Sequence, residues 1–155
     1  MTDSPAGSHT EILRADECWQ YLKSSYIGRL AVINGDVPEI FPVNFSVAGG
    51  TLMFRTGPGT KLRALLSGAV AALEVDGLNP YATEVWSVVA KGRPEPFDET
   101  RMALPDSDPD RQPWEPGVKD HLVAITPTEI SGRRFAVRSR VRWWPPVDFS
   151  ADWLD

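Results

Sequence analysis

Hydrophobic and polar residues alternate along much of this chain, with the two-residue period that is typical of β-strands. The alternation is clearest in residues 39–47. One side of that segment carries Phe41, Val43, Phe45 and Val47, and the other carries Ile40, Pro42, Asn44 and Ser46. The pattern predicts a strand with one buried face.

Further strands are predicted where similar segments are bounded by turn residues. Strands over 26–33 and 51–56 flank the first one, and the turns Asn34-Gly35-Asp36 and Ala48-Gly49-Gly50 would join all three into a meander. Later strands are predicted over 69–75, 85–93 and 120–126, and residues 129–135 would extend or pair with the last of these.

Two short helices are predicted between the strands. The first lies near 16–24, with Asp16 as its N-cap, and the second runs from an N-cap at Thr60 to about Leu66. Short strands, tight turns and two minor helices predict a small, mainly β barrel of the α+β class.

Pro42 restricts where its strand can lie. Proline has no backbone N–H to donate, so it disfavours a regular central strand. An edge strand, a bulge, or a place where the backbone faces a ligand would each accommodate it, and the edge alone suffices.

The chain ends differ in composition from the middle. Residues 1–10 are predicted to be a frayed tail, residues 11–142 a single domain, and residues 143–155 an aromatic C-terminal tail that carries Trp143, Trp144 and Trp153. Residues 94–116 are rich in proline and acidic residues. This segment is predicted to be a long excursion, either a functional loop or a covering loop without a ligand.

Composition narrows the function classes. A length of 155 residues with 42% hydrophobic content suits one globular domain, and the net charge of -5 argues against general nucleic-acid binding. The single cysteine, Cys18, can form neither an intrachain disulfide nor a metal cluster. We found neither a secretory signal nor an apolar stretch long enough to span a bilayer, so we expect a cytoplasmic protein without membrane contact.

The most specific local feature is the segment from Phe54 to Leu62, in which a strand ends, a Gly57-Pro58-Gly59 turn follows and a helix begins. Backbone N–H groups at a helix start, the cations Arg55 and Lys61, and the hydroxyls of Thr56 and Thr60 would together hold a phosphate monoester. The segment matches neither the P-loop nor the dinucleotide fingerprint. A plain strand-to-helix connection with a solvated Lys61 is the alternative.

Several motifs occur in a family-typical order. They are Tyr26-Ile-Gly-Arg-Leu30, Ile40-Phe-Pro-Val-Asn-Phe45, the segment from Arg55 to Leu62, and Trp86-Ser-Val-Val-Ala-Lys-Gly92. With them the chain resembles the pyridoxamine 5'-phosphate oxidase-like superfamily, from about Cys18 to Arg134, and within it the small flavin or deazaflavin oxidoreductases. The resemblance implies a six-stranded antiparallel split barrel of the FMN-binding type and a homodimer with the cofactor at the subunit interface.

The resemblance also implies which residues contact the cofactor. The flavin ring would lie against the strand of Phe41, Pro42, Val43 and Asn44, with Trp86 and Ser87 nearby. The phosphate would be held by Arg55, Thr56, Thr60, Lys61 and Leu62. Trp114 would reach the site from the second subunit.

The expected function is an FMN-dependent oxidoreductase acting on a small molecule, with no catalytic residue named because the flavin supplies the redox chemistry. The late arginines, Arg138, Arg140 and Arg142, do not align with the substrate-phosphate motif of true pyridoxamine phosphate oxidases. They would instead suit the long anionic tail of a deazaflavin, coenzyme F-420, so a deazaflavin-dependent reductase is one alternative. A flavin-binding or sensor module without turnover is the other. No metal site is predicted.

Overall fold

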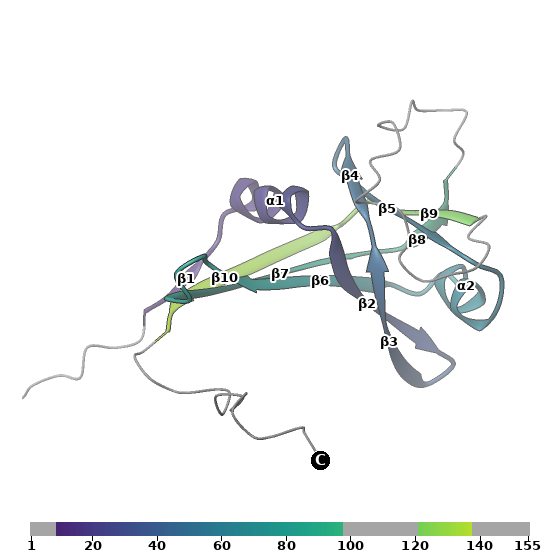
Figure 1. Ribbon diagram of the computed structural model, residues 1–155. Coiled ribbons are helices and arrows are strands. Elements are labelled where there is room, and N and C mark those ends of the chain that lie inside the picture. Colours follow the sequence, from purple (N-terminus) through teal and green to yellow (C-terminus); the bar gives the residue numbers. More distant parts are fainter. Residues whose placement is uncertain (1–8, 98–120, 138–155) are drawn as a thin grey trace, which may run out of the picture.

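The computed structural model describes residues 9–97 and 121–137. Ten strands form two antiparallel sheets, and two short helices pack beside them (Figure 1). The mainly β fold predicted from the alternation is therefore confirmed.

The larger sheet has six strands in the order β1-β10-β7-β6-β2-β3. Their bounds are β1 Thr10–Ile12, β10 Glu129–Ala136, β7 Glu84–Gly92, β6 Ala71–Leu78, β2 Ile27–Asn34 and β3 Val37–Asn44. Because β3 is an edge strand, the backbone N–H that Pro42 lacks does not interrupt the hydrogen bonding in the centre of the sheet. The edge interpretation is therefore confirmed.

The smaller sheet has four strands in the order β4-β5-β9-β8. Their bounds are β4 Ser46–Ala48, β5 Thr51–Thr56, β9 His121–Ile125 and β8 Pro94–Pro96. The start of the predicted proline-rich excursion is thus a strand, while residues 98–116 of it lie outside the described part of the chain. The short strand β1 likewise includes Thr10, which was expected in the tail.

The predicted meander over 26–56 is wrong. The segment 39–47 divides at Phe45, so that β3 pairs with β2 in the larger sheet and β4 pairs with β5 in the smaller one. The Phe45 N–H donates to the Tyr26 carbonyl at 3.1 Å, and its side chain is only 1% exposed. This buried residue carries the chain from one sheet to the other, which alternation along one strand cannot reveal.

Helix α1, Ala15–Ser24, packs against β10 and β7 and buries Cys18 and Leu22. Its N-cap is Arg14 rather than the predicted Asp16. The Glu17 carboxylate accepts the Arg14 N–H at 3.3 Å, while Asp16 pairs with the Arg14 guanidinium at 3.1 Å. An acidic residue in the first turn stabilises the helix as a cap would, but from inside it.

Helix α2, Thr60–Leu65, contacts β2 and lies beyond β2 and β3 from α1 in Figure 1. Its N-cap is Gly59 and not the predicted Thr60. The φ of Gly59 is 133°, a value that residues with a side chain rarely adopt. Neither described helix is long and apolar enough to cross a membrane.

The core lies between the two sheets and α1. Residues opposite one another on neighbouring strands share a face, and the inner face of the larger sheet carries Leu30, Leu73 and Val88, each fully buried. The smaller sheet contributes Leu52, Phe54 and Ile125. The other face of the larger sheet, here called the outer face, exposes apolar side chains. Among them are Ile27, Ile33, Ile40, Leu78 and Phe135.

Candidate functional site

The edge strand β3 presents the residues that were expected to frame a ring. Phe41 and Val43 point to the inner face, where Val43 is buried and Phe41 packs against the core. Pro42 and Asn44 lie on the outer face, opposite Arg29 and Ile27 of β2. The predicted stretch therefore divides between two faces, and a single ring could contact only one of the two pairs through side chains.

The end of β5 presents two of the residues expected to hold phosphate. Arg55 is half-buried, and Thr56 lies opposite His121 of β9. Thr56 is 2% exposed, the one buried polar side chain in the described part of the chain. Its hydroxyl donates to the Gly57 carbonyl at 3.3 Å. This long hydrogen bond keeps the hydroxyl directed at the turn between β5 and α2.

Helix α2 supplies the remaining predicted phosphate residues. Thr60 is exposed and accepts a hydrogen bond from Arg63 at 3.3 Å. Lys61 is half-buried, and Leu62 packs against the core with Phe41. Since α2 spans six residues, its dipole is small and the cations and hydroxyls dominate the electrostatics of this turn.

One contact joins the two predicted halves of the site. The Lys61 ammonium lies over the ring of Phe41, with Nζ 4.7 Å from the ring centroid. This is within the range of a cation–π interaction. The start of α2 and the inner face of β3 are thereby neighbours, although their residues are far apart along the chain.

Trp86 of β7 occupies a different environment. Its ring stacks on Tyr21 of α1 with centroids 4.2 Å apart, and it covers Gly77, where a Cβ atom would come within 2.8 Å of the indole. Since β6 and β2 separate β7 from β3, Trp86 is at least three strand spacings, or about 14 Å, from Phe41. Ser87 is on the outer face opposite Asp76, and Trp114 lies outside the described residues.

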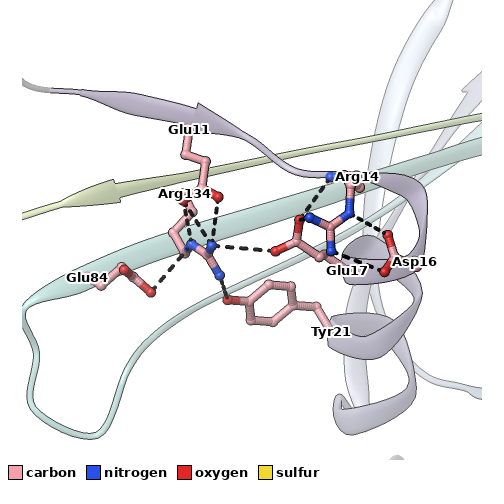
Figure 2. Close-up of polar contacts among 7 residues, drawn as sticks. All are labelled: Glu11, Arg14, Asp16, Glu17, Tyr21, Glu84 and Arg134. Atoms are coloured by element: carbon pink, nitrogen blue, oxygen red, sulfur yellow. Dashed lines mark hydrogen bonds and ion pairs between the residues drawn. The ribbon is translucent and has the colours of Figure 1, made fainter.

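A charged cluster that no local sequence pattern predicts surrounds Arg134, as Figure 2 shows. The Arg134 guanidinium donates to Glu11 of β1 at 2.9 Å, to Glu17 of α1 at 3.4 Å and to the Tyr21 hydroxyl at 3.4 Å, and lies 3.8 Å from Glu84. The hydrogen bonds to Tyr21 and Glu11 raise the pKa of Arg134 above its ordinary value. Arg134 therefore links its own strand, β10, to β1, α1 and β7.

A second cluster lies on the outer face. Arg29 donates to Glu74 and to Asp76, each at 3.1 Å. Burial, and then the neighbouring Asp76 carboxyl, raise the pKa of Glu74 despite the opposing effect of Arg29. Residues two apart in a strand share a face, so Glu74 and Asp76 lie side by side, and the pairing of β2 with β6 supplies their cation.

No group of three or more His, Cys, Asp or Glu side chains within 9–97 and 121–137 is placed to hold a metal ion. His121 is exposed at the start of β9. Cys18 lies on the buried side of α1, and burial raises the pKa of its thiol. Among the residues predicted to bind a cofactor, those of β3, β5 and α2 meet at one junction, where Lys61 lies over Phe41.

The family model for pyridoxamine 5'-phosphate oxidase matches residues 14–134, a span that includes this junction. The chain belongs to the pyridoxamine 5'-phosphate oxidase family. The predicted split barrel, with its six-stranded antiparallel sheet, is confirmed by the related structures of this family.

Relatives of this pyridoxamine 5'-phosphate oxidase family member share about a third of its residues. The FAD binding protein from Mycobacterium smegmatis is 33% identical with a TM-score of 0.60, over 82% of this chain and 99% of that one. A candidate pyridoxamine 5'-phosphate oxidase from Corynebacterium glutamicum is 31% identical with a TM-score of 0.67, over 83% and 100%. The uncharacterized protein Rv0080 of Mycobacterium tuberculosis is 31% identical over 83% of this chain and 87% of its own length.

Proposed function

We propose that this protein binds a flavin, FMN in the first instance, and acts as a flavin-dependent oxidoreductase on a small molecule. Family membership and the likeness to the FAD binding protein from Mycobacterium smegmatis support a flavin. FMN is favoured because the predicted residues would hold one phosphate monoester. FAD, which that relative binds, is the competing identity.

The contact between Lys61 and Phe41 carries this proposal. It brings the cation expected to bind phosphate within 4.7 Å of the ring expected to frame the isoalloxazine. A flavin mononucleotide needs an anion site and an apolar surface beside each other. The residues present fit that requirement.

In this proposal each residue of the junction has a defined task. Lys61 and Arg55 neutralise the phosphate charge, the Thr60 hydroxyl donates to its oxygens, and the Thr56 hydroxyl would donate to them in place of the Gly57 carbonyl. Phe41, Val43 and Leu62 provide the apolar surface and exclude water. When bound, the flavin supplies the redox chemistry, and the protein supplies orientation and electrostatics.

We further propose a homodimer that associates through the part of the outer face formed by β2 and β3. Ile27, Ile33 and Ile40 there are 37%, 44% and 68% exposed, and β3 is an edge strand beside them. Exposed apolar patches of this kind are typical of interfaces. Pro42 and Asn44 would then face the partner subunit, and Trp114 would reach the site from it.

The deazaflavin alternative needs a broader basic groove. Arg134 does not provide it, because its guanidinium is paired with Glu11 and Glu17. Arg138, Arg140 and Arg142 lie outside the described residues. We therefore prefer a flavin on the likeness to the FAD binding protein from Mycobacterium smegmatis, and the titration with coenzyme F-420 tests the alternative.

The test is an absorbance spectrum of the purified protein, followed by mass identification of any ligand released on denaturation and titration of the apoprotein with FMN, FAD and coenzyme F-420. Release of FMN or saturable FMN binding supports the proposal. Preferential binding of FAD or the deazaflavin corrects the cofactor. Binding of none of the three overturns it, and tight binding without reduction by any nicotinamide donor favours the non-enzymatic module.

A further inference from the structure

A row of exposed apolar side chains crosses the outer face at the end far from β3. Phe135 of β10 lies opposite Val85 of β7, which in turn lies opposite Leu78 of β6. Phe135 is 41% exposed and Leu78 is 58% exposed. Ile12 of β1, which is 70% exposed, is diagonal to Phe135 on the same face. We refer to these four residues as the apolar row.

A groove adjoins the apolar row at the edge of the sheet. Its volume is about 500 Å³, and it is lined by the apolar residues Ile12, Phe135 and Ala136 and by the polar residues His9, Thr10, Glu11, Glu84 and Arg134. The groove opens beside β1, which is an edge strand with one unpaired side. Ile12 and Phe135 belong to both the groove and the apolar row, and together they offer an aromatic side chain a hollow with apolar contacts beside polar ones.

The chain leaves the described fold at the same place. Ala136 lies opposite Glu84, and the Val137 N–H donates to the Thr83 carbonyl at 2.8 Å. The described chain thus ends beside the turn between β6 and β7, two residues after Phe135. Residues 138–155 include Trp143, Trp144 and Trp153, half of the six tryptophans in the sequence.

We propose that residues 138–155 bind back onto the apolar row and groove of their own chain, with Trp143 and Trp144 as the main contacts. Fully stretched, the segment would reach roughly 60 Å. The row spans four strands, or about 14 Å. Length is therefore no obstacle to the contact.

The position of the segment argues for this occupant over a separate molecule. A ligand attached two residues from its site has an effective concentration in the millimolar range, which a free partner rarely reaches. The apolar row also shares no residue with the proposed dimer contact of Ile27, Ile33 and Ile40. The inference does not depend on flavin binding.

Limited trypsin digestion of the full-length protein tests the proposal through cleavage after Arg140 and Arg142, followed by mass spectrometry. Leu78→Gln combined with Phe135→Gln makes the row polar, and Ile33→Gln combined with Ile40→Gln is the matched control on the same face. We expect cleavage at least tenfold faster in the first variant than in the wild type, with no change in the control.

Equal cleavage rates in the wild type and the row variant would overturn the proposal. Protection of Arg140 and Arg142 that is lost when the protein dissociates into monomers would also overturn it, whether dissociation is caused by dilution or by the control substitutions. The row would then be covered by a second copy of the chain. If the row variant does not fold, full-length protein with Trp143→Ser and Trp144→Ser replaces it. Hydrogen exchange over residues 10–12 and 79–83 should then become several-fold faster, and unchanged exchange would refute the contact.

Discussion

Arg134 on β10 holds Glu11 on β1 in a bidentate ion pair, with Nη2 2.9 Å from each carboxylate oxygen. The same guanidinium reaches Glu17 of α1, whose side chain is only 16% exposed. The first strand and the first helix are thus attached to the sheet through one arginine (Figure 2).

The substitution Arg134→Met should lower the free energy of unfolding by about 1–2 kcal/mol. Hydrogen bonds between charged groups are lost, and the carboxylate of Glu17 loses a neighbouring positive charge. Amide exchange in residues 10–12 should rise more than exchange in β6. The control is Arg14→Met, which removes a 73% exposed partner and should cost less than about 0.5 kcal/mol. An equal loss of unfolding free energy in the two variants would contradict the role of Arg134 in attaching β1 and α1 to the sheet.

Gly77→Ala should destabilise the protein by about 1–3 kcal/mol, since the new Cβ would come within 2.8 Å of the Trp86 ring and displace it from Tyr21. Near-ultraviolet circular dichroism should report the altered stacking, and denaturant unfolding the energy. Adding Trp86→Phe to Gly77→Ala should restore part of the lost stability. A second substitution that only adds to the loss would show that the crowding lies elsewhere.

Glu74→Gln should stabilise the protein at neutral pH and have little effect in acid. The raised pKa of Glu74 means that the folded state favours the protonated carboxyl, so its contribution is full below the unfolded value of about 4.3 and is lost as pH rises through the folded pKa. Thermal unfolding of the wild type and the variant between pH 4 and pH 7 measures the difference. A gap between the melting curves that does not widen with pH would contradict this expectation.

Lys61→Ala should weaken flavin binding roughly 10- to 100-fold, the effect of removing one charge-assisted hydrogen bond to a phosphate. Fluorescence titration of the apoprotein with FMN measures it. The matched control is Lys91→Ala, because Lys91 pairs with Glu129 at 3.6 Å on the larger sheet and has no proposed part in the site. Affinity that is unchanged in Lys61→Ala, or reduced equally in the control, would argue against the phosphate assignment.

The prediction of the strands and turns from sequence succeeded where the signal is local. Alternation depends only on which side of a strand each residue faces, and the tight turn after Asn34 depends only on residues that tolerate positive φ; Gly35 indeed has a φ of 68°. Pro42 disfavoured a regular central strand because a missing donor is a property of the residue itself, and the structure places its strand at the edge of the sheet. The residues assigned to the cofactor came from resemblance, and they stay predictions.

Tertiary structure decided what depends on residues distant in sequence. The division of 39–47 at Phe45, the ion pairs of Arg134 with Glu11 and Glu17, and the position of Lys61 over Phe41 each join segments that no local pattern connects. The N-cap of α1 was not predicted either, because Arg14 contributes its backbone N–H and not a typical capping side chain. Local periodicity fixes which residues face inward, whereas the partners they meet there are set by how the two sheets pair and pack.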